Sequence, residues 1–184
     1  MAENLGQTPS NMIRGLSQDH FSLLGLPARY AVDHALLESR YRELQSQVHP
    51  DRFAAGSDAE RRVAMQWATR ANEAYRTLRD PVGRARYLLS LKGFDTGEET
   101  NTSMPADFLM QQMEWRESVA EASAARDANA LARLGGDIAL ARAEMLQVLA
   151  RAIDEDANYD AGCSLVRKLR FLEKLEEEID EALE

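Results

Sequence analysis

The residues best suited to do chemistry in this chain are the tripeptide His49-Pro50-Asp51 and the Arg52 that follows it. An ionised aspartate offers two acceptor oxygens, which an arginine on a partner protein can bind together. Pro50 disfavours helical geometry at His49, so a helix arriving here should stop near Val48. The residues predict a charged, exposed turn that contacts another protein. A plain helix stop followed by a turn is the competing interpretation.

Two amphipathic segments flank the tripeptide and must position it. Before it, apolar residues recur every three or four positions, at Leu37, Tyr41, Leu44 and Val48. After it, the same spacing continues at Ala64, Ala68, Ala71, Tyr75 and Leu78. This period marks one face of a helix, and two helices joined by a short loop pack as an antiparallel hairpin. We therefore expect the tripeptide at a hairpin tip, with Arg40 and Arg42 behind it on the first helix.

A second group of side chains suited to binding lies on a predicted helix of residues 105–125. When Phe108 is placed at 0°, the core-facing residues within about 40° of it are Trp115, Val119 and Ala122. The opposite side carries Met110, Met113, Glu114, Glu117 and Glu121, with Leu109 on the flank. Methionine suits adaptable contact surfaces, so we expect a binding site here. Burial of both sides of the helix is the alternative, and the glutamates alone would be an ordinary solvated row.

The last predicted helix repeats this pattern more weakly. Its core stripe is expected to consist of Leu165, Leu169, Leu172, Ile179 and Leu183. Phe171 lies about 120° from that stripe. It either packs at the rim of the core or belongs to an interface, and the period does not choose between these.

Composition limits the class of protein. The 184 residues are 45% hydrophobic and 29% charged, which is ordinary for a globular protein. No apolar run is long enough to span a membrane, and the N-terminus lacks a signal-peptide pattern. The one cysteine, Cys163, excludes an internal disulfide or a multi-cysteine metal site. We expect a cytoplasmic protein that does not associate with membranes, in which Cys163 is a small packed side chain.

Charge is distributed unevenly along the chain. Residues 19–92 carry twelve Lys and Arg against nine Asp and Glu, a balance of +3, whereas residues 93–184 carry nine against twenty-one, a balance of −12. Neither part has the concentrated basic face that nucleic acid requires. The contrast indicates two protein partners of different character.

The order of patterns predicts an all-α chain in two modules. Residues 1–18 read as a flexible extension, residues 19–92 as a module containing the hairpin, residues 93–104 as a linker and residues 105–184 as an antiparallel three-helix bundle. The expected helices lie around Phe21–Leu24, from Asp33 to Val48, and over residues 58–79, 81–92, 105–125, 128–151 and 160–183. Asp19 and Asp33 are expected to cap the first two.

The first module resembles the J-domain family of co-chaperones. The hairpin follows the short segment DHFSLLGLP (residues 19–27), carries His-Pro-Asp between its helices, and ends in NEAYRTLRDP (residues 72–81). The resemblance covers roughly Asp19 to Lys92. It implies the all-α J-domain fold.

The whole chain after about Gln18 is similar to the HscB family, the specialised J-domain co-chaperones of iron–sulfur cluster biogenesis. The residues that carry this similarity are FLMQQME (108–114), VRKLRFL (166–172), FSLLGLPARY (21–30) and RARYLLSL (84–91). The resemblance implies no catalysis and no cofactor of the chain's own. A ligand role for Cys163 in cluster handling is an alternative that we rank below packing.

The resemblance also implies two partners. The DnaK-type chaperone HscA would be contacted, and its ATPase stimulated, through His49, Pro50, Asp51, Arg40, Arg42 and Arg52. The cluster scaffold protein IscU would be bound, and delivered to HscA, through Leu109, Met110, Met113, Glu114, Glu117, Glu121 and Phe171. The alternative is a general J-domain co-chaperone for unfolded clients of DnaK, but the Gly/Phe-rich linker and CxxC repeats typical of that class are missing from the sequence. An enzyme is disfavoured because the three histidines are scattered and no hydrolase or phosphate-binding motif occurs.

Overall fold

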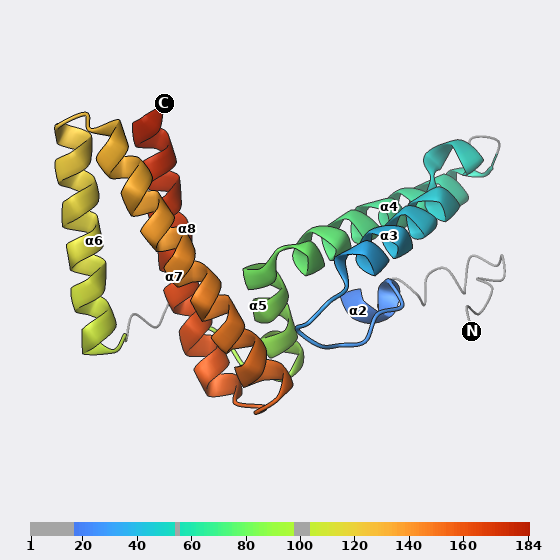
Figure 1. Ribbon diagram of the computed structural model, residues 1–184. Coiled ribbons are helices and arrows are strands. Elements are labelled where there is room, and N and C mark those ends of the chain that lie inside the picture. Colours follow the sequence, from blue (N-terminus) through green and yellow to red (C-terminus); the bar gives the residue numbers. More distant parts are fainter. Residues whose placement is uncertain (1–16, 54–55, 98–103) are drawn as a thin grey trace. The chain divides into compact units, whose positions relative to one another are not determined.

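The computed structural model describes residues 17–53, 56–97 and 104–184, and within these ranges every regular element is helical (Figure 1). The all-α prediction is therefore confirmed. No helix among the described residues is long and apolar enough to cross a membrane. The predicted extension falls outside the described ranges except for Ser17 and Gln18. The chain divides into two compact units, Met1–Arg84 and Ala85–Glu184, and each is considered by itself below.

Three capped helices form most of the first unit. Asp19 caps α2 (His20–Leu23), and its carboxylate accepts hydrogen bonds from the backbone N–H groups of Phe21 and Ser22 at 2.9 and 3.0 Å. Asp33 caps α3 (His34–Val48) in the same way. Ser57 is the N-cap of the long helix α4 (Asp58–Arg79). Both predicted aspartate caps are confirmed, because an N-cap depends only on residues within one turn.

Helices α3 and α4 run antiparallel as the predicted hairpin (Figure 1). The side chains of Leu37, Trp67 and Leu78 are almost completely buried, and each full burial of this kind stabilises the fold by about 1.5–3 kcal/mol. At the edge of the hairpin the rings of Tyr41 and Tyr75 stack with centroids 4.2 Å apart. The Tyr41 hydroxyl also donates to Asn72 Oδ1 at 2.7 Å, which ties the two helices together.

The second unit contains the bundle of α6 (Ala106–Ala124), α7 (Ala128–Asp154) and α8 (Tyr159–Leu183). Its core consists of Val119, Ala122, Leu131, Ile138, Leu172, Leu175 and Ile179. On the predicted stripe of α8, Leu169, Leu172 and Ile179 are buried and Leu165 is half-buried. The prediction for Leu183 was wrong: its side chain is 44% exposed because it is the last helical residue, where no further turn covers it.

The C-terminal half of α5 (Pro81–Leu91) packs with this bundle. A Cβ atom added to Gly162 of α8 would lie only 3.3 Å from a methyl carbon of Leu89, so the two helices approach closely there. The chain that follows α5 is also attached to α8, because Arg167 Nη1 donates to the carbonyl of the buried Thr96 at 2.7 Å. The rings of Phe94 and Tyr159 lie 5.2 Å apart. The start of the predicted linker is thus bound to α8, and the domain limits given above stay a prediction.

Candidate functional site

The described part of the hairpin tip contains a short helix in addition to the turn at His49. Helix α3 ends at Val48 as predicted, and His49 has extended geometry with φ −59° and ψ 131°. Residues Pro50–Phe53 then form the short 3₁₀ helix η1, which the sequence pattern did not predict. A single 3₁₀ turn leaves no apolar period to detect, since it is only four residues long.

The Asp51 carboxylate is a highly accessible charged group of the tip. Its side chain is 90% exposed. The Asp51 N–H donates to His49 Nδ1 at 3.3 Å, while a carboxylate oxygen lies 3.6 Å from the same nitrogen. Because Nδ1 accepts the backbone hydrogen bond, it does not also donate to the carboxylate. Both carboxylate oxygens are therefore available to a donor on another protein, as expected from the sequence.

The Arg52 side chain reaches from the tip to the last turn of α3. Its Nη1 donates to the carbonyl of Ser46, in the last turn of α3, at 3.2 Å. Carbonyls of the last turn of a helix have no hydrogen-bond partner within the helix. A cation there is also attracted to the negative end of the helix dipole. Arg52 thus caps α3 and holds η1 against it. The role of Arg52 in contacting the chaperone stays a prediction.

The two arginines behind the tip both have acidic neighbours on α3. Arg40 lies 3.4 Å from a carboxylate oxygen of Glu43, and Arg42 lies 2.5 Å from one of Glu38. Such exposed pairs contribute about 0–1 kcal/mol and exchange easily. These pairs therefore hold the two arginines only weakly, and these four side chains together carry no surplus of positive charge. The role of Arg40 and Arg42 in partner contact stays a prediction.

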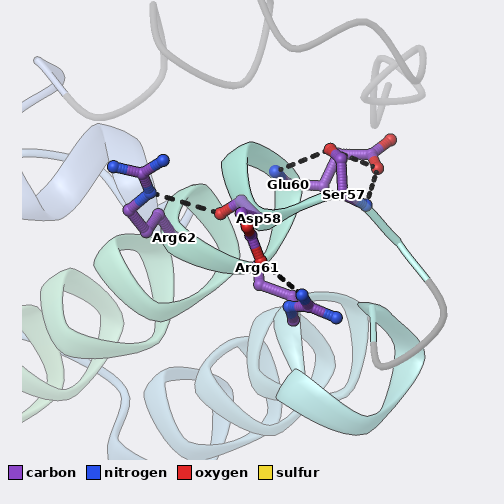
Figure 2. Close-up of polar contacts among 5 residues, drawn as sticks. All are labelled: Ser57, Asp58, Glu60, Arg61 and Arg62. Atoms are coloured by element: carbon purple, nitrogen blue, oxygen red, sulfur yellow. Dashed lines mark hydrogen bonds and ion pairs between the residues drawn. The ribbon is translucent and has the colours of Figure 1, made fainter.

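A capping box fixes the other end of the tip, at the start of α4 (Figure 2). The Ser57 hydroxyl accepts from the Glu60 N–H at 3.3 Å, and the Glu60 carboxylate accepts from the Ser57 N–H at 2.7 Å. The Ser57 N–H and the Ser57 hydroxyl, which donate to the Glu60 carboxylate at 2.7 and 2.9 Å, lower the pKa of Glu60. Asp58 and Arg61 form an ion pair, and Arg62 donates to the Asp58 carbonyl at 3.3 Å. Helix α4 thus starts from a well-defined point close to the tip in sequence.

The second candidate surface lies on α6 and is apolar at its centre. Leu109, Met110 and Met113 are 41%, 65% and 72% exposed, while Phe108 and Val119 on the opposite side are buried. The alternative in which both sides of the helix are buried is therefore wrong for these three residues. Large apolar side chains grouped on an exposed face mark interaction sites. We call Leu109, Met110 and Met113 the α6 patch.

Acidic side chains continue from the α6 patch toward the C-terminal end of the same helix. Glu114, Glu117 and Glu121 are all exposed. None of them forms an ion pair with a described residue. This row of carboxylates would attract a partner whose surface combines apolar and basic groups.

Phe171 of α8 is a packing residue at the edge of this surface. It is half-buried, and its ring meets Phe108 edge-on with centroids 6.0 Å apart. Two cations cover the aromatic pair: the Arg116 guanidinium lies 5.3 Å from the Phe171 centroid and the Lys168 ammonium 5.0 Å from the Phe108 centroid. These cations were not predicted, because charged residues on the flank of a core stripe give no periodic signal. The partner-binding role of Phe171 stays a prediction.

Two further titratable side chains, His20 and Cys163, are buried, whereas His34 is exposed. His20 is 3% exposed, and burial together with the charge of Arg70 lowers the pKa of its imidazole. Cys163 is 6% exposed, and burial raises the pKa of its thiol, in agreement with its predicted packing role. Within the described ranges, no three His, Cys, Asp or Glu side chains gather in a way that could hold a metal ion.

Comparison with known proteins finds relatives of this chain. Residues 104–180 match a family described as the HSCB C-terminal oligomerisation domain. A Co-chaperone protein HscB homolog of Burkholderia multivorans is 52% identical over 169 residues, covering 92% of this chain and 96% of the relative.

Two solved structures are similar to this chain over most of its length. Chaperone HscB from Vibrio cholerae has a TM-score of 0.78 and 36% identity, covering 89% of this chain and 96% of its own. Human co-chaperone protein HscB has a TM-score of 0.84 and 32% identity, covering 90% of this chain and 82% of its own. The fold and the sequence thus point to the same relatives.

Proposed function

Because this chain belongs to the HscB family of co-chaperones, we propose that it links the scaffold protein IscU to the DnaK-type chaperone HscA. In this proposal the bundle binds IscU while the hairpin tip contacts HscA and stimulates its ATPase. Holding both partners on one chain raises their effective concentration for each other without any new contact between them. The result would be delivery of the scaffold and its cluster to the chaperone during iron–sulfur protein maturation.

The observation that carries the proposal is the exposure of the α6 patch. A hairpin with an exposed Asp51 would serve any J-domain co-chaperone, including one that acts on unfolded clients of DnaK. An apolar group with a fixed position on a rigid helix, bordered by three carboxylates, instead favours one folded partner. The patch is thus the feature that distinguishes the specialised function from the general one.

At the tip, the proposed contact is between the Asp51 carboxylate and a cationic group of the chaperone. Two accessible oxygens suit a bidentate arginine. The Arg52 cap on α3 would keep η1 from moving away when the chaperone binds. Arg40 and Arg42 would exchange their partners on α3 for acidic groups of the chaperone.

The test is steady-state ATP hydrolysis by HscA with this protein, with and without IscU. We expect stimulation by the co-chaperone and a further increase with IscU. DnaK, assayed in parallel, should respond less and should be indifferent to IscU. Stimulation of DnaK alone, unaffected by IscU, would support the general co-chaperone and exclude the proposed delivery role.

A further inference from the structure

Two exposed methionines, Met110 and Met113, lie on the α6 patch of the second unit. Met110 and Met113 are the most exposed of the described methionines, and Met65 of α4 follows at 60%. Cys163 is the opposite case, since it is buried and the raised pKa of its thiol keeps the thiolate fraction low at neutral pH. An oxidant that reaches this unit should therefore react at the methionine pair before it reacts at the cysteine.

We propose that Met110 and Met113 are a reversible oxidation site that controls scaffold binding, an inference that rests on the proposed function. The oxidant is a peroxide. A sulfur lone pair attacks one peroxide oxygen, the S–O bond forms as the O–O bond breaks, and proton transfer to the leaving oxygen releases water. Each sulfur loses two electrons to one peroxide. Methionine sulfoxide reductases return the thioether, with two thiols supplying the electrons and forming a disulfide while the oxygen leaves as water.

The neighbours of the pair explain why oxidation should weaken binding. Glu114 lies four residues after Met110 and Glu117 four residues after Met113, so each carboxylate shares the face of its methionine. An ionised carboxylate only accepts hydrogen bonds, and so does a sulfoxide oxygen. Arg116 is one turn from Met113, but its guanidinium lies over the Phe171 ring.

A sulfoxide on the α6 patch therefore lacks a suitable donor among its helix neighbours. In the free protein, water supplies that donor, and the fold is unaffected because the side chains are on the surface. Against a docked partner the water is lost, and a buried acceptor without a hydrogen bond is unfavourable. Oxidation would thus act on the complex and leave the free protein folded.

Binding of the scaffold should in turn protect Met110 and Met113 from oxidation. A scaffold that covers the α6 patch shields both sulfur atoms from peroxide. Met65 belongs to the other unit and is not part of the patch, so it serves as an internal reference in the same molecule. This protection can be read by mass spectrometry without any measurement of ATPase activity.

The experiment uses the full chain as wild type, M65L and M110L/M113L, each with and without hydrogen peroxide. Sulfoxide at each methionine is quantified by peptide mass spectrometry, and the affinity for IscU is measured by calorimetry. After peroxide treatment, wild type and M65L should bind IscU at least about tenfold more weakly than before. M110L/M113L should bind IscU as tightly after treatment as before it. Treatment with both epimer-specific sulfoxide reductases should restore the wild type, and bound IscU should protect Met110 and Met113 but not Met65.

Two results of the calorimetry would overturn the inference. One is an unchanged affinity for IscU in wild type that carries sulfoxide at both positions, and the other is an equal loss of IscU affinity in M110L/M113L after peroxide treatment. Equal oxidation of all three methionines in the presence of saturating IscU would also overturn it. Failure of the untreated protein to bind IscU is a different result, since it would remove the proposed function and the oxidation site with it.

Discussion

The substitution Asp51→Asn separates the function of the hairpin tip from its stability. The Asp51 side chain is 90% exposed, and His49 Nδ1 lies 3.6 Å from its carboxylate. Exposed pairs contribute about 0–1 kcal/mol, so the free energy of unfolding should change by no more than about 0.5 kcal/mol. Removal of one charge from a pair buried at an interface costs about 2–5 kcal/mol. At 1.4 kcal/mol per tenfold change, that predicts an affinity for the chaperone about 30 to 4,000 times weaker.

The assay is HscA ATP hydrolysis over a concentration series of each variant, together with urea unfolding. Asp58→Asn is the matched control, because Asp58 is also an exposed aspartate near the tip but pairs with Arg61 on its own helix (Figure 2). We expect stimulation to be lost with Asp51→Asn and retained with Asp58→Asn. Wild-type stimulation by Asp51→Asn, or an equal loss in both variants, would refute the assignment of the carboxylate as the contact.

Three further predictions concern both units. Met110→Ala with Met113→Ala should weaken calorimetric IscU binding by about 1–4 kcal/mol; a loss no larger than that of Met65→Ala would mean that the pair is outside the interface. Ser57→Ala should lower the unfolding free energy by about 1 kcal/mol in urea, whereas Ser57→Asp, which can still cap, should not; equal losses would contradict the cap. Since the folded-state pKa of His20 is lowered, the unfolded chain takes up this proton first. Stability should therefore fall as pH drops from about 6.5 until the folded pKa is passed, and His20→Gln should reduce that slope between pH 7 and 5.5; unchanged slopes would rule the histidine out.

Features set by neighbouring residues were predictable from the sequence. The Asp19 and Asp33 caps and the end of α3 before Pro50 depend on steric and hydrogen-bond effects within one turn. The exposed side of α6 followed from a long, regular period, because the position of Phe108 and Val119 on the core side determines where Met113 must point.

Features set by distant contacts were not predictable. The bond between Arg167 and the Thr96 carbonyl joins residues 71 positions apart, and no local pattern indicates it. The period assigned Leu183 to the core because a helical pattern cannot show where the neighbouring helices end. Arg116 and Lys168 were missed for a related reason: their contacts with Phe171 and Phe108 depend on how α6 and α8 pack.

The hydrogen bonds that shape the described part of the tip are local, but η1 also packs against α4, so the tip can be transplanted only next to a second helix placed like α4. The longest of these hydrogen bonds, from Arg52 to Ser46, spans six residues, and the bond from Asp51 to His49 spans two. The direction of the Asp51 carboxylate is therefore set by the hydrogen bonds of residues 46–53 together with the packing of η1 against α4. Grafted onto an unrelated antiparallel helical hairpin whose second helix is placed like α4, this segment should keep its geometry and would make a minimal ligand for asking how much of chaperone activation a single loop can supply.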